Sequence, residues 1–253
     1  MKRHIPNALT CLNLLCGCLA LTFIFQGELI TAAWFVAVAA IADFFDGLAA
    51  RALRVSSPIG KDLDSLADMV SFGVVPGAIL FKLLTLTPDL RTPATSLGTA
   101  GVTLDNPAAP LAYLGFLVTI FSALRLAKFN NDTRQTNSFI GLPTPACTLV
   151  VASLPLVLAQ DKGYLLPAFL LNPWVLLGLT VLLSGLLVAE LPLFALKFKN
   201  LNWRGNRRRF IFMVLTLALL GWLQAAGVPL AVLLYVLLSV PGRVRSRDLP
   251  DAQ

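Results

Sequence analysis

Long runs of hydrophobic residues separated by short polar segments make up most of this chain. A membrane-spanning helix needs about 20 apolar residues, and runs of that kind are expected at 9–25, 29–50, 63–84, 108–129, 145–159 and 166–189. A final apolar stretch, 210–240, is too long for one comfortable span and is broken by Gly227 and Pro229, so it predicts two short helices. The pattern therefore predicts an all-α, polytopic helical membrane protein with about eight transmembrane helices.

These spans are expected to form a single membrane domain over residues 1–253. Residues 1–191 would be its six-helix catalytic core, and residues 192–253 would add a basic loop and two short C-terminal membrane helices. No internal repeat divides the chain further.

Composition supports a membrane setting, and charge predicts the orientation. Hydrophobic residues make up 57% of the chain and charged residues 13%, whereas a soluble domain carries about a quarter charged residues. All but three of the 20 Lys and Arg residues lie at the termini or in loops on one predicted side, and the exceptions are Lys82, Arg91 and Lys162. Because Lys and Arg predominate in cytoplasmic loops, that side should face the cytosol. The membrane is expected to be a bacterial inner membrane. The net charge of +7 then reflects topology, and nucleic acid is not an expected partner.

Four carboxylates interrupt two of the apolar runs. Residues 43–68 read DFFDGLAARALRVSSPIGKDLDSLAD. At about 100° per residue, Asp43 and Asp46 share one face of a helix, and Asp64 and Asp68 share one face of the next. An isolated Asp in hydrocarbon costs roughly 2.5 to 3.5 kcal/mol, so four together require a compensating charge. Hard divalent cations prefer oxygen ligands, and small residues between the acids would let phosphates approach. The segment predicts a site for divalent cations and a diphosphate.

Two other interpretations of the acids are open at this point. They could form salt bridges that hold helices together, or they could belong to a cation or proton transporter. A transporter's acids should lie near the middle of the bilayer. These lie toward the ends of two predicted helices, beside Arg51 and Arg54, which favours an enzyme that takes one substrate from lipid and one from water.

The same segment resembles the signature of the CDP-alcohol phosphatidyltransferases, D-x-x-D-G-x-x-A-R followed after eight residues by G-x-x-x-D-x-x-x-D. The positions that match are Asp43, Asp46, Gly47, Ala50, Arg51, Gly60, Asp64 and Asp68. Members of this family are membrane enzymes that transfer a phosphatidyl group from CDP-diacylglycerol to an alcohol. The segments PNALTCLNLLCG, SLADMVSFGVVPG, LRLAKFN and FIGLPTPA look like the phosphatidylserine synthase branch. The resemblance thus covers about residues 6–145.

This resemblance implies roles for individual residues. Two divalent cations, Mg²⁺ or Mn²⁺, would be bridged by Asp43 and Asp64, with Asp46 completing one site. Asp68 would complete the other and act as the general base. The residues expected to hold CDP-diacylglycerol are Asn7, Thr10, Asn13, Gly47, Ala50, Arg51, Ser57 and Gly60.

Some of these residues also have a purely local explanation. Asn7 and Thr10 could cap the start of the first helix. Ser57 before Pro58 is typical of a helix N-cap followed by proline in the first turn, and such a helix start would also suit a diphosphate.

The acceptor alcohol implied by the resemblance is L-serine. Arg125 and Asn130 could hold its carboxylate or ammonium group, or they could anchor the fourth helix at the cytosolic surface. Glycerol 3-phosphate, the acceptor of phosphatidylglycerophosphate synthases, would bring two negative charges and require further Arg or Lys residues. Few such residues lie near the motif, although this alternative stays open. The resemblance also implies a homodimer.

Overall fold

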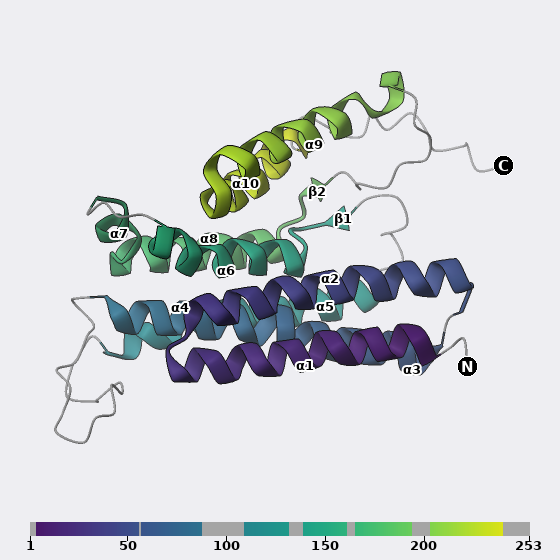
Figure 1. Cartoon of the computed structure of the whole chain (residues 1–253), viewed down its shortest axis with the longest axis horizontal. Helices are drawn as coiled ribbons and strands as arrows, with labels where there is room; N and C mark the ends of the chain where they lie inside the picture. The colour runs from purple at the N-terminus through teal and green to yellow at the C-terminus, as the bar shows by residue number, and fades with distance from the viewer. Residues whose placement is uncertain are drawn as a thin grey trace.

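Hydrophobic runs become long helices that lie roughly along one direction, with the N-terminal helices on one side and the C-terminal pair on the other (Figure 1). The computed structural model describes residues 4–55, 57–87, 109–131, 139–160, 165–193 and 203–239. The elements are α1 (His4–Gln26), α2 (Leu29–Leu53), α3 (Pro58–Asp68), the π-helix η1 (Met69–Val74), α4 (Val75–Leu86), the 3-10 helix η2 (Ala109–Phe116), α5 (Leu117–Asn131), β1 (Phe139–Ile140), α6 (Thr144–Gln160), α7 (Leu165–Leu170), α8 (Pro173–Val188), β2 (Pro192–Leu193), α9 (Trp203–Leu223), the 3-10 helix η3 (Gln224–Ala226) and α10 (Gly227–Ser239).

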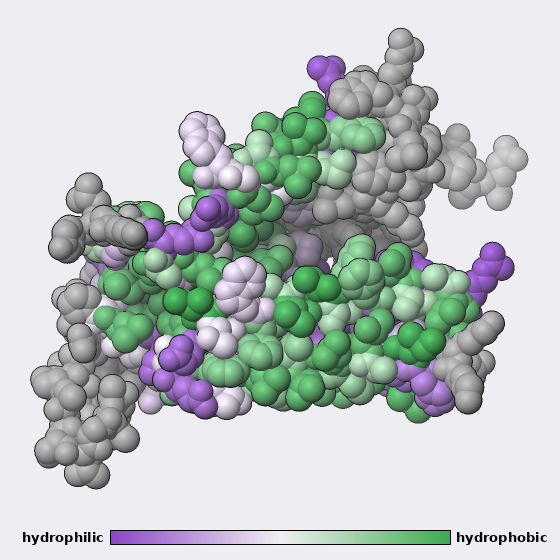
Figure 2. Space-filling model, in the orientation of Figure 1, coloured by the Kyte–Doolittle hydropathy of each residue, from purple (hydrophilic) through white to green (hydrophobic). Residues whose placement is uncertain are grey.

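The helices confirm an all-α polytopic membrane protein. Five helical segments of the described chain are long and apolar enough to cross a membrane, and they are His4–Gln26, Leu29–Leu53, Pro58–Leu86, Pro110–Asn131 and Arg209–Ser239. Two shorter apolar helices, α6 and α8, lie between the last two of these. Figure 2 shows a broad band of hydrophobic surface over α1 and α2, with hydrophilic residues toward its two ends. That distribution suits a protein surrounded by lipid.

Two of the predicted runs are divided differently from the expectation. The sixth run splits into α7 and α8, because the side chain of Asn172 accepts a hydrogen bond from the N–H of Trp174 at 2.9 Å and Pro173 begins a new helix. The last run does form two helices, but the chain turns at Gln224, whose φ of 50° is left-handed, rather than at Gly227 or Pro229. Pro229 lies in the first turn of α10, where a proline leaves no hydrogen bond unmade.

The third span contains a π-helical turn, η1, which ends two residues before Pro76. Proline has no N–H for the carbonyl four residues earlier, which here belongs to Phe72. The hydroxyl of Thr148 on α6 donates to that carbonyl at 2.9 Å, and the hydroxyl of Thr119 on α5 donates to the carbonyl of Gly73, also at 2.9 Å. Side chains of neighbouring helices thus replace the backbone bonds that the distortion gives up, as membrane helices require.

Close packing of α1 against η1 positions the functional residues. The hydroxyl of Ser71 donates to the carbonyl of Asn13 at 3.0 Å. A Cβ atom at Gly17 would overlap the same hydroxyl and lie 3.0 Å from the Cα of Ser71, so only glycine permits this approach. As a result, the polar face of α1 lies directly against the helix that carries Asp64 and Asp68.

A two-residue pairing of strands was not predicted. Phe139 pairs with Leu193 and Ile140 with Pro192 in an antiparallel arrangement. Gly141 follows with a φ of +79°, and a Cβ atom there would lie 2.6 Å from the carbonyl oxygen of Leu187. The close approach lets the N–H of Leu142 donate to the carbonyl of Leu186 at 2.9 Å, which ties the entry of α6 to the end of α8. Arg91, Lys162 and the basic C-terminal residues on which the charge argument also depended lie outside the described residues.

Candidate active site

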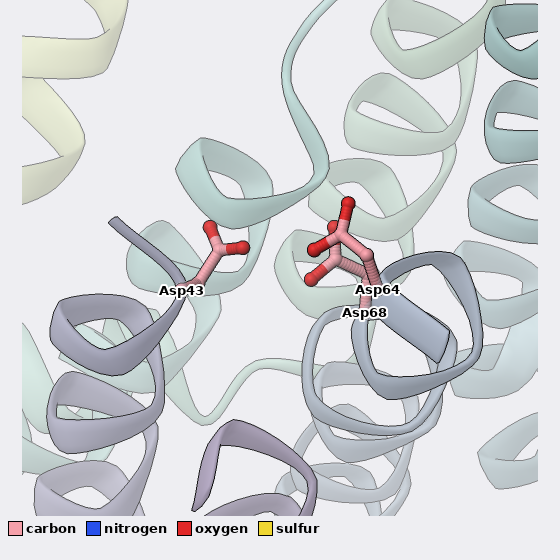
Figure 3. Close-up of side chains that lie close together, drawn as sticks. All are labelled: Asp43, Asp64 and Asp68. Atoms are coloured by element: carbon pink, nitrogen blue, oxygen red, sulfur yellow. The ribbon is translucent and has the colours of Figure 1, made fainter. Parts of the chain in front are cut away.

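Three of the four predicted acids converge from two helices. One carboxylate oxygen from each of Asp43 on α2, Asp64 on α3 and Asp68 on α3 lies within 4.8 Å of the other two, and all three side chains are half-buried. Figure 3 shows the carboxylate of Asp43 facing those of Asp64 and Asp68 across the space between the helices. The spacing of four residues between Asp64 and Asp68 puts them on one helix face. The convergence inferred from residue spacing is therefore present for these three acids.

Asp46 occupies a separate position beside this group. Its side chain is buried, with 6% exposed, and it accepts a hydrogen bond of 2.7 Å from the hydroxyl of Thr10 on α1. On the same helix, the amide of Asn13 donates to Asp68 at 3.2 Å. Because α1 already includes His4, Thr10 is not at its N-cap. The polar face of α1 instead holds two of the acids.

The donor set fits a hard divalent cation. Among the residues that the structure describes, none of the four carboxylates forms a salt bridge with Lys or Arg, which argues against a structural salt-bridge cluster. The side-chain oxygen of Asn13 is buried and accepts no hydrogen bond within the described ranges. Oxygen ligands gathered in one small volume without protein cations to neutralise them are what Mg²⁺ and Mn²⁺ sites require. This arrangement is consistent with the expectation of divalent metal.

A pocket of about 240 Å³ lies beside the acids. Both Asp46 and Asp64 line it, and so do most of the residues predicted to hold the nucleotide lipid, namely Asn7, Thr10, Gly47, Ala50, Ser57 and Gly60. Asn13 contacts Asp68 instead. Arg51 is exposed one turn after Gly47, with a guanidinium nitrogen 3.9 Å from the position of a Cβ atom at Gly47. The structure thus brings these residues together, while their contacts with a ligand stay predictions.

The start of α3 presents positive charge to this pocket. Ser57 is the N-cap, its hydroxyl oxygen accepts a hydrogen bond of 3.0 Å from the N–H of Gly60, and Pro58 occupies the first turn. Lys61 also lines the pocket. A helix N-terminus carries about half a positive charge and exposes N–H groups. Lys61 and this helix start together suit an anionic diphosphate. Lys61 was missed in the sequence because it occupies an unspecified position of the signature.

Gly60 lies where added atoms would enter the pocket. A Cβ atom there would lie 2.9 Å from the hydroxyl of Ser57 and 3.1 Å from the side-chain oxygen of Asn7. We predict that Gly60→Ala raises the KM for CDP-diacylglycerol about tenfold, since overpacking costs about 1 to 3 kcal/mol. Steady-state kinetics in mixed micelles measures this. Gly178→Ala is the matched control, because nothing lies within 4 Å of a Cβ atom there, and an unchanged KM in Gly60→Ala would contradict the prediction.

The two residues proposed to hold the acceptor lie in different surroundings. Arg125 on α5 is 8% exposed, donates to the hydroxyl of Thr144 at 3.3 Å, and has no partner for its Nε among the described residues. Asn130 is exposed and donates to the hydroxyl of Ser65 at 2.9 Å. Asn130 therefore links the end of α5 to α3, whereas Arg125 is turned into the protein. Thr144 was missed as a partner because its segment, FIGLPTPA, suggested only a family likeness.

Comparison with known proteins identifies the family. A family model described as CDP-alcohol phosphatidyltransferase matches residues 3–189. The chain belongs to the CDP-alcohol phosphatidyltransferase family. The match extends past residue 145, where the resemblance seen in the sequence ended, and it includes all four acids and the pocket beside them. Membership in this transferase family makes the chain an enzyme and removes the transporter interpretation.

Relatives within the family carry more specific names. The chain is 30% identical to a CDP-diacylglycerol–serine O-phosphatidyltransferase of Helicobacter pylori strain J99 over 85% of this chain and 80% of the relative. It is 32% identical to a Bacillus subtilis protein of the same name over 62% of this chain and 80% of that protein. An archaetidylserine synthase of Methanothermobacter thermautotrophicus is 28% identical over 59% of this chain and 56% of its own length.

Proposed function

We propose that this chain transfers the phosphatidyl group of CDP-diacylglycerol to the hydroxyl of L-serine, giving phosphatidylserine and CMP. Family membership supports phosphatidyl transfer, and the names of the relatives support serine as the acceptor. The observation that carries the proposal is the convergence of Asp43, Asp64 and Asp68 next to a pocket lined by polar and small residues. Such a site can serve a phosphate-containing substrate that enters from the membrane.

The acids would hold two divalent cations, Mg²⁺ or Mn²⁺. Asp43 and Asp64 would contribute to both sites, Asp46 to one and Asp68 to the other. When bound, two such cations neutralise the diphosphate and stabilise the charge that develops during displacement at phosphorus. The described acids would supply the oxygen ligands. Activity assays with each metal would decide between Mg²⁺ and Mn²⁺.

The chain's own residues would prepare both reactants. The start of α3 and Lys61 would bind the diphosphate of the donor, with Gly47, Ala50 and Gly60 leaving room for the nucleotide. The amide of Asn13 donates to one oxygen of Asp68 at 3.2 Å, and Asp68 would accept the proton of the serine hydroxyl. The serine oxygen then bonds to the phosphatidyl phosphorus as the bond from that phosphorus to CMP breaks. CMP leaves with the electron pair of the broken bond.

Arg125 is the residue that we propose for the carboxylate of serine. Its guanidinium is buried and incompletely hydrogen-bonded among the described residues, and α5 packs against η1, which begins directly after Asp68. A buried guanidinium with a free N–H binds a carboxylate through charge-assisted hydrogen bonds. A role for Asn130 stays a prediction, since its amide is already bonded to Ser65.

We place the active site on the cytosolic side of a bacterial inner membrane. Arg51, Arg54, Lys61 and Lys128 lie at the ends of helices near the acids, and the positive-inside rule puts such residues in the cytosol. The homodimer implied by the family resemblance also stays a prediction. Crosslinking of the chain in native membranes tests it, with a band at twice the monomer mass as the expected result.

A direct test of the acceptor uses the purified enzyme with CDP-diacylglycerol and Mn²⁺ or Mg²⁺. Isotope-labelled L-serine and labelled glycerol 3-phosphate are supplied in separate reactions, and the lipid products are identified by mass spectrometry. We expect labelled phosphatidylserine from the first reaction and no labelled lipid from the second. Labelled phosphatidylglycerophosphate without phosphatidylserine would overturn the proposal in favour of the glycerol 3-phosphate alternative.

A further inference from the structure

A second pocket lies far from the acids, between α1, α4 and η2. Its volume is about 390 Å³, which is within the range of sites that bind small ligands. Side chains of α1 and α4 such as Leu21, Ile24 and Ala78 make it largely apolar, and the polar groups that line it come from Lys82, Thr85 and Tyr113. None of these residues belongs to the site described above.

The pocket is on the opposite side of the membrane from the acids. Asp64 and Lys82 belong to one continuous helical segment, Pro58–Leu86, and are separated by 18 residues. At 1.5 Å per residue this separation is about 27 Å, close to the thickness of the hydrocarbon core, about 30 Å. Ile24 and Phe25 likewise lie at the end of α1 away from Thr10 and Asn13. The polar groups of the pocket are therefore at the level of the opposite leaflet's headgroups.

Lys82 gives the pocket a charge that its own walls do not neutralise. Its side chain is half-buried and forms no salt bridge with an acid of the described residues. The hydroxyl of Thr85 donates to the carbonyl of Lys82 at 2.7 Å, so its oxygen is left to accept. An ammonium group beside apolar walls is stabilised by an anion. Because the apolar walls of this pocket lie within the membrane, the anion that fits it best is one that also carries apolar chains.

The aromatic wall of the pocket is held in place by tight helix packing. The ring of Phe81 stacks on Phe116 at 5.5 Å and contacts Tyr113 at 5.2 Å between centroids. A Cβ atom at Gly115 would lie 2.6 Å from the backbone nitrogen of Phe81, so α4 and η2 approach as closely as glycine allows. Phe81 and Phe116 thus form a fixed wall of the pocket, whereas Phe25 and Tyr113 line its exposed side. Tyr113 has the amphipathic ring typical of membrane interfaces.

We propose that this pocket binds one anionic phospholipid of the leaflet opposite the active site. An acyl chain would lie against Phe81, Phe116 and the apolar residues of α1, and the headgroup phosphate would contact Lys82. A lipid is favoured over a protein partner because the apolar part of the pocket lies at the depth of the hydrocarbon core, where lipid chains are the available ligands. The charge of Lys82 selects a headgroup with net negative charge over a zwitterionic headgroup.

The proposal is tested by native mass spectrometry of the full chain, delipidated in detergent and titrated with phosphatidylglycerol or phosphatidylcholine. We expect the wild type to bind phosphatidylglycerol at least fivefold more tightly than phosphatidylcholine, and Lys82→Met to lose this preference. Lys128→Met is the matched control, because Lys128 is an exposed lysine at the other end of the helices, and it should keep the preference. Ala78→Trp, which fills the apolar part, should weaken binding of both lipids.

Serine transfer in Lys82→Met should stay within about twofold of the wild type, which separates this site from the active site and from the proposed function. Equal binding of the two lipids by the wild type, or an unchanged preference in Lys82→Met, would overturn the proposal. Either result would mean that lipid at this pocket is held no more specifically than the lipid around any membrane protein.

Discussion

Asp68→Asn is expected to lower the rate of phosphatidyl transfer at least about 1,000-fold. Loss of a general base alone costs about 10²- to 10⁴-fold, and the substitution also removes one negative charge from the proposed cation site. The amide oxygen of an asparagine can still accept the 3.2 Å hydrogen bond from Asn13, so the helices should pack as before. Incorporation of labelled serine into lipid measures the rate, and binding of CDP-diacylglycerol should be retained.

Asp62→Asn is the matched control for this variant. Asp62 lies on the same helix, α3, but is exposed and outside the group of converging acids. Its substitution removes an equal charge from the same helix but not from the converging acids, so the rate should stay within about twofold of the wild type. Wild-type turnover in Asp68→Asn would remove Asp68 from the mechanism, and an equal loss in both variants would assign the effect to surface charge.

Arg125→Met should raise the KM for L-serine about 10- to 150-fold while leaving the KM for CDP-diacylglycerol nearly unchanged. A hydrogen bond to a charged group contributes about 1.5 to 3 kcal/mol, and each 1.36 kcal/mol corresponds to a factor of ten. The split between the two KM values is the informative result, because a loss of folded protein would lower the rate at all concentrations of either substrate. Arg125→Lys should recover part of the affinity for serine.

Lys128→Met serves as the control for Arg125, since Lys128 lies one turn later on α5 and is exposed. Its removal should not change the KM for serine. If Arg125→Met also left that KM unchanged, Arg125 would be an anchor of α5 through Thr144 and Phe129, whose ring centre is 5.9 Å from the guanidinium carbon. The serine carboxylate would then have another partner.

The acidic site was predictable because residue spacing within a helix fixes which side chains share a face. Asp64 and Asp68 are four residues apart, and Asp43 lies on the face of α2 that turns toward them. The N-cap at Ser57 was equally predictable, since the serine and the following proline act within a single turn. Such local rules need no knowledge of how the helices pack, whereas the approach of Asp43 on α2 to Asp64 and Asp68 on α3 does depend on that packing.

Contacts between helices could not be read in the same way. Thr10 and Asn13 were expected near a ligand, but their bonds to Asp46 and Asp68 depend on the close approach of α1 to η1 at Gly17 and Ser71. Spacing also could not separate Arg125 from Asn130, because burial of one and exposure of the other depend on how α5 packs against its neighbouring helices.

Breaks within apolar runs were located only approximately for a related reason. The sequence has Gly227 and Pro229 as the evident breaking residues of the last run, yet the turn is at Gln224. A Cβ atom at Gly227 would lie 2.5 Å from the carbonyl of Leu219, so this glycine is required by the close contact of α9 with the start of α10 rather than by the turn itself. The need for glycine was visible in the sequence, but its structural reason was not.

The most direct measurement of the central claim is the initial rate of phosphatidylserine formation by metal-free enzyme as free Mn²⁺ is increased at saturating CDP-diacylglycerol and L-serine. If two cations are held by the four acids Asp43, Asp46, Asp64 and Asp68, no product should be detectable in the presence of chelator. The rate should then rise with the occupancy of two ions per chain until it saturates. Phosphatidylserine formed at the full rate by enzyme shown to be free of divalent metal would contradict the account.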